Sequence, residues 1–309
     1  MNRTIYLLII YFFLSCVNIK AQTIESIDLK KDSLFSKTKL LKHIQALSSD
    51  AFEGRRTGSN GAVKARSYIV NQFYTLGVSP FYKQYERPFS FSNENKRYSG
   101  ANILGFIKGT EFPDKYMVIS AHYDHEGVKK GMIYNGADDN ASGVAALFSF
   151  AEYFKSHSPK HSIVLAAFDA EELGLNGSKY FLNNLKIKLS QIKVNLNMDM
   201  ISRSDENELF AVGTKHHQFL KKIILNTKGS GKLKLKIGHE DGDWKDNWTY
   251  SSDHANFYKK RIPFLYFGVP DHKDYHEPTD DFENIHPDFY IDAVKTIISV
   301  FEKLDAMTL

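Results

Sequence analysis

The chain has 309 residues, of which 42% are hydrophobic and 14% aromatic. That is enough to bury the core of one large α/β domain or two smaller ones. Its formal charge is +4, and without the first 21 residues it is +2, with 38 basic against 36 acidic side chains. Such an even balance argues against nucleic acid as a main partner.

The first residues have the layout of a secretory signal peptide. Arg3 precedes an apolar stretch from Ile5 to Val17, and a short polar segment then ends at Ala21. Cleavage after Ala21 would remove residues 1–21. The apolar stretch is too short to span a bilayer comfortably. The sequence therefore predicts a secreted or periplasmic protein.

Cys16 is the only cysteine, and it lies inside the predicted signal peptide. A lipid anchor on Cys16 is the alternative to simple cleavage, because Leu14-Ser15-Cys16 loosely resembles a lipoprotein cleavage box. Without that lipid we expect no stable membrane partner. We expect residues 22–309 to form a single domain, whose metal sites can only use His, Asp and Glu.

The first part of that domain predicts two helices followed by extended chain. Residues 36–48 have the apolar spacing of a short amphipathic helix, and a glycine-rich turn leads to a second helix over 62–73. Residues 82–107 look extended, with a polar turn at 93–95. Arg55-Arg56, between the two helices, could bind a substrate carboxylate, but an exposed structural pair is the simpler interpretation.

The central part alternates strands with helices. Short continuous apolar runs are typical of strands buried on both faces, and they span residues 116–121, 163–168, 194–198 and 262–267. Asn140 can cap a helix that reaches Phe154, and the chain from Ser178 is helical. Residues 232–236 alternate like an edge strand, and His286-Pro287 opens a C-terminal helix. This order predicts an α/β fold with a mostly parallel sheet covered on both faces.

Six side chains suited to a metal site follow these strands or lie in later loops. They are His122, Asp139, Glu171, Glu172, Asp199 and His276. Ligands gather beyond the carboxyl ends of parallel strands, where at least three of these positions lie. Five ligands suffice for two divalent cations, and a spare carboxylate could move a proton to and from a metal-bound water. The pattern predicts a metal-dependent hydrolase.

The paired acids leave alternatives open. One aspartate of Asp138-Asp139 could bridge two cations, or Gly136–Gly143 could be an ordinary helix cap. Glu171 and Glu172 cannot both point the same way, so one could coordinate metal while the other faces the water. The alternative for that pair is a solvated acidic loop.

The segment from Ala121 to His125 contains two histidines, and a histidine that binds metal must have its ring held in one orientation. A metal-binding imidazole needs a hydrogen bond at its other ring nitrogen. Asp124 is well placed to give His122 that bond, and we expect His125 to point elsewhere.

Several segments resemble peptidase family M28, which includes co-catalytic di-zinc aminopeptidases. The matching segments are Ala121-His-Tyr-Asp-His125, Gly136-Ala-Asp-Asp-Asn-Ala-Ser-Gly143, Phe168-Asp-Ala-Glu-Glu-Leu-Gly-Leu175, Asn197-Met-Asp-Met200 and Tyr275-His-Glu-Pro-Thr-Asp280. Ser49–Gly58 and Ser252-Asp253-His254 are similar to two further family segments. The resemblance covers residues 40–305, with the motifs in the expected order.

The resemblance implies a three-layer α/β/α sandwich with a mixed central sheet and two Zn²⁺ per chain. His122 and Asp199 would hold one zinc, and Glu172 and His276 would hold the other. Asp139 would bridge them. Nitrogen and oxygen ligands alone would also accept cobalt or manganese.

The resemblance also implies that Glu171 is the general acid/base and that Tyr275 stabilises the tetrahedral intermediate. The expected function is a secreted exopeptidase, first of all an aminopeptidase, acting on a peptide or small aminoacyl substrate. The alternatives are a glutaminyl cyclase of the same fold with one zinc, and a non-catalytic binding relative. The loop at 238–248, with Trp244 and Trp248, could line the rim of a substrate pocket or pack its tryptophans inward.

Overall fold

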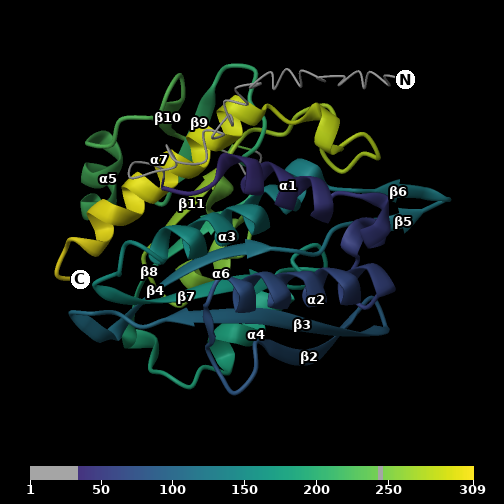
Figure 1. Cartoon of the computed structure of the whole chain (residues 1–309), viewed down its shortest axis with the longest axis horizontal. Coiled ribbons are helices and arrows are strands. Elements are labelled where there is room, and N and C mark those ends of the chain that lie inside the picture. The colour runs from purple at the N-terminus through teal and green to yellow at the C-terminus, as the bar shows by residue number, and fades with distance from the viewer. Residues whose placement is uncertain (1–33, 243–245) are drawn as a thin grey trace, which may run out of the picture. The chain divides into compact units, whose positions relative to one another are not determined.

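A computed structural model describes residues 34–242 and 246–309 (Figure 1). The predicted signal peptide, Cys16 and Trp244 lie outside these residues. No helix within the described residues is long and apolar enough to cross a membrane.

The centre of the fold is a nine-stranded mixed sheet. Across the sheet its strands are β1 (Ser79–Pro80), β3 (Lys96–Ile107), β7 (His161–Phe168), β4 (Phe112–His122), β8 (Ile192–Met198), β11 (Phe264–Gly268), β9 (Glu208–Val212) and β10 (Lys234–Ile237), and β2 (Glu86–Asn93) pairs with β3. The four strands from β7 to β11 are parallel to one another. Strand β3 joins β7 antiparallel, and β9 joins β11 antiparallel.

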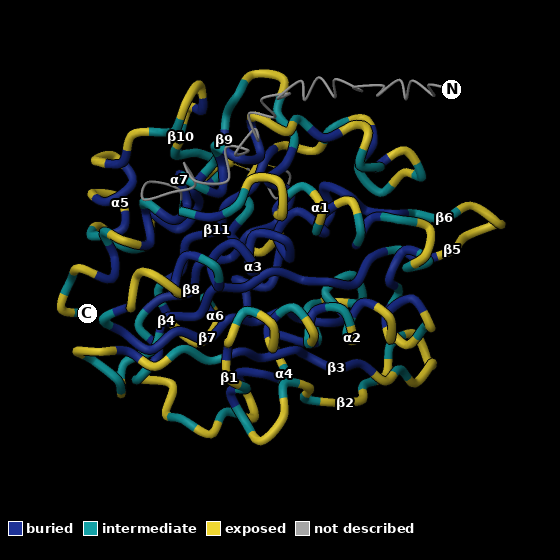
Figure 2. The backbone as a smooth tube through the Cα atoms, in the orientation of Figure 1, coloured by how far each residue is buried: buried dark blue, intermediate teal, exposed yellow. Residues whose placement is uncertain are grey.

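Helices cover both faces of the sheet, which makes three layers. One face packs against α1 (Lys37–Leu47), α2 (Asn60–Thr75), α3 (Gly143–Phe154), α5 (Gln218–Leu225) and α7 (Pro287–Asp305). The opposite face packs against α4 (Asn176–Asn183) and α6 (His254–Lys259). The buried central strands and the exposed outer loops are distinct in Figure 2. The predicted α/β/α sandwich with a mixed sheet is confirmed, and four of the eight strand pairs are parallel, three of them at the centre of the sheet.

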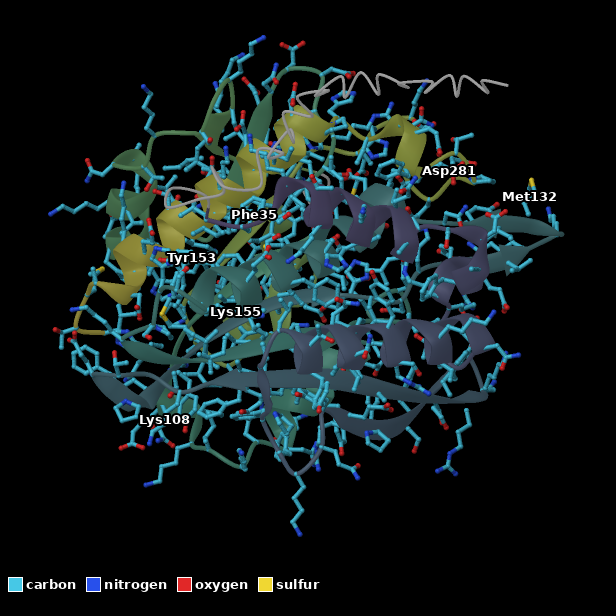
Figure 3. All side chains as sticks on the ribbon, viewed as in Figure 1. Phe35, Lys108, Met132, Tyr153, Lys155 and Asp281 are labelled. Carbon is cyan, nitrogen blue, oxygen red and sulfur yellow. The ribbon has the colours of Figure 1, made fainter. Side chains whose placement is uncertain are left out.

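The apolar runs of the sequence are explained by this double cover. On β4, Met117 and Ile119 face the larger helical layer, while Val118 faces the layer of α4 and α6. A strand with no solvent face needs no polar alternation. Side chains fill the space between the layers (Figure 3), and the Tyr153 hydroxyl of α3 donates a hydrogen bond to Glu302 of α7 at 2.9 Å.

The element boundaries differ from the predictions in several places. Helix α3 begins at Gly143 rather than after Asn140, although the Asn140 side-chain oxygen accepts a hydrogen bond from the Gly143 amide at 2.9 Å. Strand β11 begins at Phe264, two residues later than predicted. Strand β10 does lie at the edge of the sheet, but two residues further along than expected.

The remaining elements are short. They are the β5 (Gly127–Lys129) and β6 (Met132–Tyr134) hairpin and the turns η1 (Asp50–Arg55), η2 (Ala137–Ser142), η3 (Leu189–Gln191), η4 (Trp248–Tyr250) and η5 (Phe282–Asn284). The unpredicted hairpin projects from the body of the domain, with Met132 near its tip (Figure 3).

Candidate metal centre

Three neighbouring parallel strands end at one edge of the sheet. His122 is the last residue of β4 and is paired in register with Phe168, the last residue of β7. Asp199 directly follows β8, which lies on the other side of β4. The carboxyl ends of these strands therefore bring the predicted side chains together, as parallel sheets commonly do.

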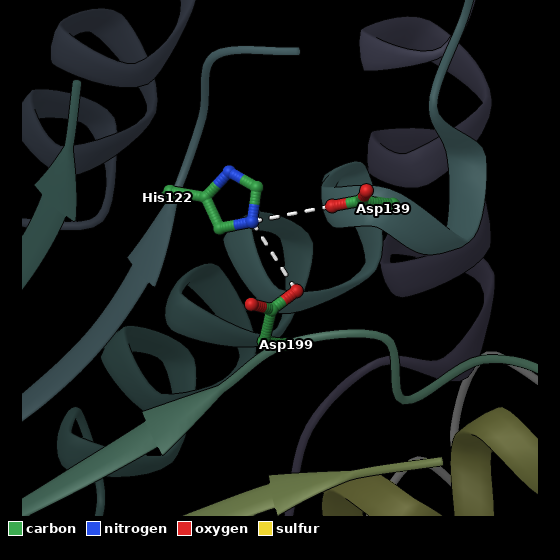
Figure 4. A group of neighbouring side chains, drawn as sticks. All are labelled: His122, Asp139 and Asp199. Atoms are coloured by element: carbon green, nitrogen blue, oxygen red, sulfur yellow. Dashed lines mark hydrogen bonds and ion pairs between the residues drawn. The ribbon is translucent and has the colours of Figure 1, made fainter. Parts of the chain in front are cut away.

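The first cluster contains His122, Asp139 and Asp199 (Figure 4). The His122 Nε2 atom lies 3.2 Å from the Asp199 Oδ1 atom and 3.2 Å from the Asp139 Oδ1 atom. Two donor atoms on one tetrahedral zinc, each about 2.0–2.1 Å from the metal, are about 3.3 Å apart. The spacing of these three donors therefore fits a zinc ion.

A second cluster shares Asp139. The His276 Nε2 atom lies 3.1 Å from the Asp139 Oδ2 atom and 3.3 Å from the Glu172 Oε2 atom. One Asp139 oxygen thus faces His122 and the other faces His276. This is the arrangement that a carboxylate bridging two cations requires.

Asp138 has a different environment from its neighbour. Its buried carboxylate accepts hydrogen bonds from the Ser202 amide at 2.7 Å and the Ser202 hydroxyl at 2.8 Å. Its other oxygen lies 3.1 Å from the His272 Nε2 atom. Asp138 therefore connects its own loop to Ser202 and His272. Of the two aspartates, only Asp139 points into the metal centre.

The backbone of η2 is held so that Asp139 points into the site. Gly136 opens η2 with a φ of +57°, and a Cβ there would lie 2.1 Å from the Asp139 carbonyl oxygen, so only glycine fits. The Asp280 carboxylate accepts hydrogen bonds from the Asp138 amide at 2.9 Å and the Asp139 amide at 3.0 Å. Asp280 thereby joins the loop of His276 to the loop of the bridging carboxylate.

His125 does not point elsewhere, so that prediction was wrong. Its fully buried Nδ1 atom lies 2.9 Å from the Glu172 Oε1 atom and 3.6 Å from the Asp139 Oδ2 atom. His125 and His276 therefore approach Glu172 through different carboxylate oxygens. The strand-and-turn geometry after β4 turns His125 back toward the site, which residue spacing alone did not indicate.

The prediction for Asp124 needs a correction as well. The His122 Nδ1 atom lies 3.1 Å from the Asp124 carbonyl oxygen, whereas the nearest carboxylate oxygen is 3.8 Å away. The backbone of Asp124 thus orients the imidazole. Its carboxylate instead accepts the amide of Glu171 at 3.1 Å and that of Glu172 at 3.3 Å, which positions the two acids.

Glu171 and Glu172 have opposite electrostatic environments. Burial raises the pKa of the Glu171 carboxyl well above its usual range; His122 opposes this, and the charge of Glu172 adds to it. Burial and Asp139 would also raise the pKa of Glu172, yet hydrogen bonds from His125 and His276 lower it to about 2. Two carboxyls with pKa values pushed apart suit one proton carrier and one anionic ligand.

The bridging candidate is also kept anionic. Burial alone would raise the pKa of Asp139, but the surrounding histidines, with His125 foremost, hold it well below its usual range. An ionised Asp139 can offer both oxygens to cations without first losing a proton.

The metal centre opens into a cavity of about 540 Å³. Its lining joins the site residues to an aromatic wall and one further acid: His122, Asp139, Glu171, Asp199, Met200, Trp248, Ser251, Tyr266, Val269, Asp271, Tyr275 and His276. Tyr275 stacks on His276 with ring centroids 4.0 Å apart, and Trp248 stacks on His239 at 3.7 Å. The volume and the mixed lining suit a small ligand held next to the metal donors.

The structure therefore brings all the predicted site residues to one cavity edge, with Glu172 just behind the lining. Sequence reasoning missed the roles of His125, Asp280 and Arg55. The only sequence signal for Asp280 is that it ends the segment that also contains His276. Arg55 was expected to be exposed, but it is 1% exposed.

In a comparison with protein families, the chain matches the model of peptidase family M28 over residues 102–301. Among curated proteins, the aminopeptidase YwaD of Bacillus subtilis is 32% identical over 207 residues, which are 63% of this chain and 42% of that protein. A probable zinc metalloprotease of Pyrenophora tritici-repentis is 35% identical over 108 residues, 34% of this chain and 22% of that protein. The chain thus spans less than half the length of these relatives.

Solved structures share the fold at low identity. A zinc aminopeptidase from Bacillus subtilis superposes with a TM-score of 0.68 at 17% identity, covering 87% of this chain and 95% of that one. A glutaminyl cyclase of Porphyromonas gingivalis superposes with a TM-score of 0.72 at 18% identity, covering 88% and 99%. At such identities only the fold is shared. The match of the family model to most of the sheet and the metal centre carries the assignment: the chain belongs to peptidase family M28.

Proposed function

We propose that the protein is a co-catalytic di-zinc exopeptidase, and specifically an aminopeptidase acting on peptides or small aminoacyl compounds. The observation that carries the proposal is the double orientation of Asp139, whose two oxygens face two different histidines at 3.2 Å and 3.1 Å. The aminopeptidase and zinc metalloprotease names of its relatives support the same reaction class.

The donor set fits two zinc ions, so each residue can be given a role. One zinc would use His122 and Asp199, and the other would use Glu172 and His276, with Asp139 shared between them. A zinc pair supplies Lewis acidity for the scissile carbonyl and lowers the pKa of water toward about 7.

Glu171 is the proposed proton carrier. Its raised pKa lets the carboxyl take a proton during attack and give it to the leaving amine, because the protonated form is not strongly disfavoured. Tyr275 lines the same cavity, and burial raises the pKa of its hydroxyl, which therefore stays a neutral donor. We propose that this hydroxyl donates to the developing oxyanion of the substrate.

The test of this function is Glu171→Gln. We expect the variant to retain two zinc ions per chain by elemental mass spectrometry, because Glu171 is not one of the five proposed ligands. Turnover of aminoacyl p-nitroanilides should fall at least about 100-fold, since only proton transfer is removed. Glu283→Gln, at an exposed glutamate that does not line the cavity, is the control for the substitution and should keep full activity.

Two outcomes would contradict the proposal. Near wild-type turnover by Glu171→Gln would remove Glu171 from the reaction. A wild-type protein that binds no zinc, even when zinc is supplied, would leave only a binding role for the domain.

A glutaminyl cyclase is the second candidate, because a glutaminyl cyclase of Porphyromonas gingivalis has the same fold. Five donors around two clusters favour the two-metal hydrolase. Peptides with an amino-terminal glutamine separate the two reactions, since cyclisation releases ammonia and leaves the peptide bond intact. Release of ammonia without release of a free amino acid would replace the peptidase by the cyclase.

Export remains part of the proposal on the strength of residues 1–21 alone. The amino-terminal sequence of the protein recovered from its producing cells would test it. An intact Met1 would count against cleavage, and a lipid on Cys16 would identify the anchored form.

A further inference from the structure

We propose that Arg55 is a positioning residue that sets the distance between the two loops of the metal centre. The inference rests on the proposed two-metal function but concerns a residue outside the ligand set. The proposed effect of Arg55 is on how tightly the metal centre binds zinc.

The Arg55 guanidinium is bonded entirely to backbone carbonyls. Its Nε donates to the Tyr123 carbonyl oxygen at 2.8 Å. One terminal nitrogen donates to the carbonyl oxygens of Leu47 at 2.7 Å and Asn135 at 2.6 Å. The other terminal nitrogen donates to the Gly136 oxygen at 2.9 Å. Four acceptors from three chain segments thus surround one planar group.

Two of those segments carry proposed metal ligands. Tyr123 directly follows His122 at the end of β4, and Gly136 opens η2, from which Asp139 projects. The distance between His122 and Asp139 therefore depends on the guanidinium between their backbones. The planar fork of arginine can satisfy these separated acceptors, whereas the point-like ammonium of lysine cannot.

Within the described part of the chain, no carboxylate lies in direct contact with the positive charge of Arg55. Among the described residues no carboxylate forms an ion pair with it, yet Asp139 and Asp280 act on it at a distance. Burial lowers the pKa of Arg55 to about 10, and those charges oppose the change, so the group remains a cation at neutral pH. A buried cation beside a cluster of carboxylates offsets part of their mutual repulsion before any metal binds.

The backbone around Arg55 is arranged to bring the side chain inward. Glu53, Gly54 and Arg55 have φ values of +50°, +63° and +53°, a left-handed backbone conformation that residues other than glycine rarely adopt. A Cβ on Gly54 would lie 2.4 Å from the Tyr134 oxygen, so the β5–β6 hairpin closes over the turn. Strain of this kind persists where the surroundings fix it, and here the four carbonyl bonds do so.

The experiment compares Arg55→Lys with Arg97→Lys. Arg97 is exposed, and among the described residues its side chain hydrogen-bonds only to the Ser90 hydroxyl, at 3.2 Å, so its lysine variant controls for the substitution itself. We expect Arg55→Lys to bind the zinc of the His122, Asp139 and Asp199 cluster 10- to 100-fold more weakly in a chelator competition, the usual cost of changing a residue behind a metal ligand. Arg97→Lys should match the wild type.

The readout is zinc affinity, so the result does not depend on activity. Two zinc ions bound by Arg55→Lys with wild-type affinity would overturn the positioning role while leaving the proposed function intact. A wild type without zinc would contradict the proposed function itself.

A second variant covers the case in which Arg55→Lys does not fold. Arg55→Ala leaves a hole that added guanidinium can enter, and ammonium is the matched cation without the fork. Recovery of the zinc at the His122, Asp139 and Asp199 cluster with guanidinium but not with ammonium would support the proposal. Failure of guanidinium to restore folded, zinc-binding protein would count against it.

Discussion

Residues of the same type have different environments in this chain, and His125 and His276 are the clearest case. His125 and His276 both contact Glu172, at 2.9 Å and 3.3 Å. Only His276 lines the cavity, and it is 35% exposed, whereas His125 is fully buried. A ligand next to the substrate must face the cavity, so we propose His276 as the metal ligand and His125 as the residue that orients Glu172.

This assignment gives a prediction for His276→Ala and His125→Ala. Removing the ligand should leave one zinc per chain, because Glu172 and Asp139 alone hold the second ion poorly. Removing the orienting histidine should keep two zincs with an affinity about 10-fold lower, the low end of such effects. Elemental mass spectrometry after dialysis measures both. If His125→Ala retained one zinc and His276→Ala retained two, His125 would be the metal ligand and His276 the residue that orients Glu172.

At the scale of elements, the packing of α1 on α2 contains a histidine kept uncharged. His43 of α1 lies 2.8 Å from the Tyr68 hydroxyl of α2 and contacts the Phe148 ring with centroids 4.9 Å apart. Burial lowers the pKa of His43 from 6.5 to about 4, an effect that Glu152 partly opposes. The helix pair is therefore held together best when His43 is neutral.

That shift predicts how stability depends on pH. Between pH 6.5 and pH 4 the unfolded chain binds the His43 proton and the folded chain does not, so stability falls as pH falls. The contribution is complete above pH 6.5 and lost through about pH 4, with a size on the order of 1–2 kcal/mol after allowing for partial exposure. Urea unfolding of His43→Leu at pH 7 and pH 4 should show a smaller drop than the wild type. An equal drop would mean that His43 is not the group responsible.

The turn η2 shows how short elements carry the site. Asp280 accepts two of its amides, and the Asn140 side chain donates to the Met198 oxygen at 2.9 Å. These bonds fix η2 both to the His276 loop and to the end of β8. The Asp139 carboxylate is thus positioned by contacts between segments about 60 and 140 residues apart in the chain.

At the scale of the whole molecule, metal binding should be coupled to folding. The donors come from three strand ends and two loops, so the unfolded chain offers no equivalent site. A ligand at 1,000 times its dissociation constant that binds only the folded state adds about 4 kcal/mol of stability. For a domain of this size that corresponds to a shift in melting temperature on the order of 10 °C.

The measurement is thermal unfolding before and after removal of zinc with a chelator, followed by re-addition of zinc. We expect a lower melting temperature without zinc and full recovery with it. Equal melting temperatures in both states would show that the metal does not bind tightly to the folded domain.

The sequence by itself predicted a sheet covered on both faces and the side chains that the structure brings together at one of its edges. Continuous apolar runs such as Ile163–Phe168 are typical of strands buried on both faces, and acids or histidines at their ends implied a site at one edge. The positions that differ by one to three residues, such as the start of α3, depend on turn geometry that periodicity does not encode.

Only the tertiary structure decided how neighbouring residues divide their roles. Spacing along the chain could not separate Asp138 from Asp139, turn His125 toward Glu172, or bury Arg55 among four carbonyls. Each of those outcomes depends on contacts between segments far apart in sequence. The physical reason is that residue type sets what chemistry a side chain can perform, whereas its orientation, burial and partners are set by the packing of the whole domain.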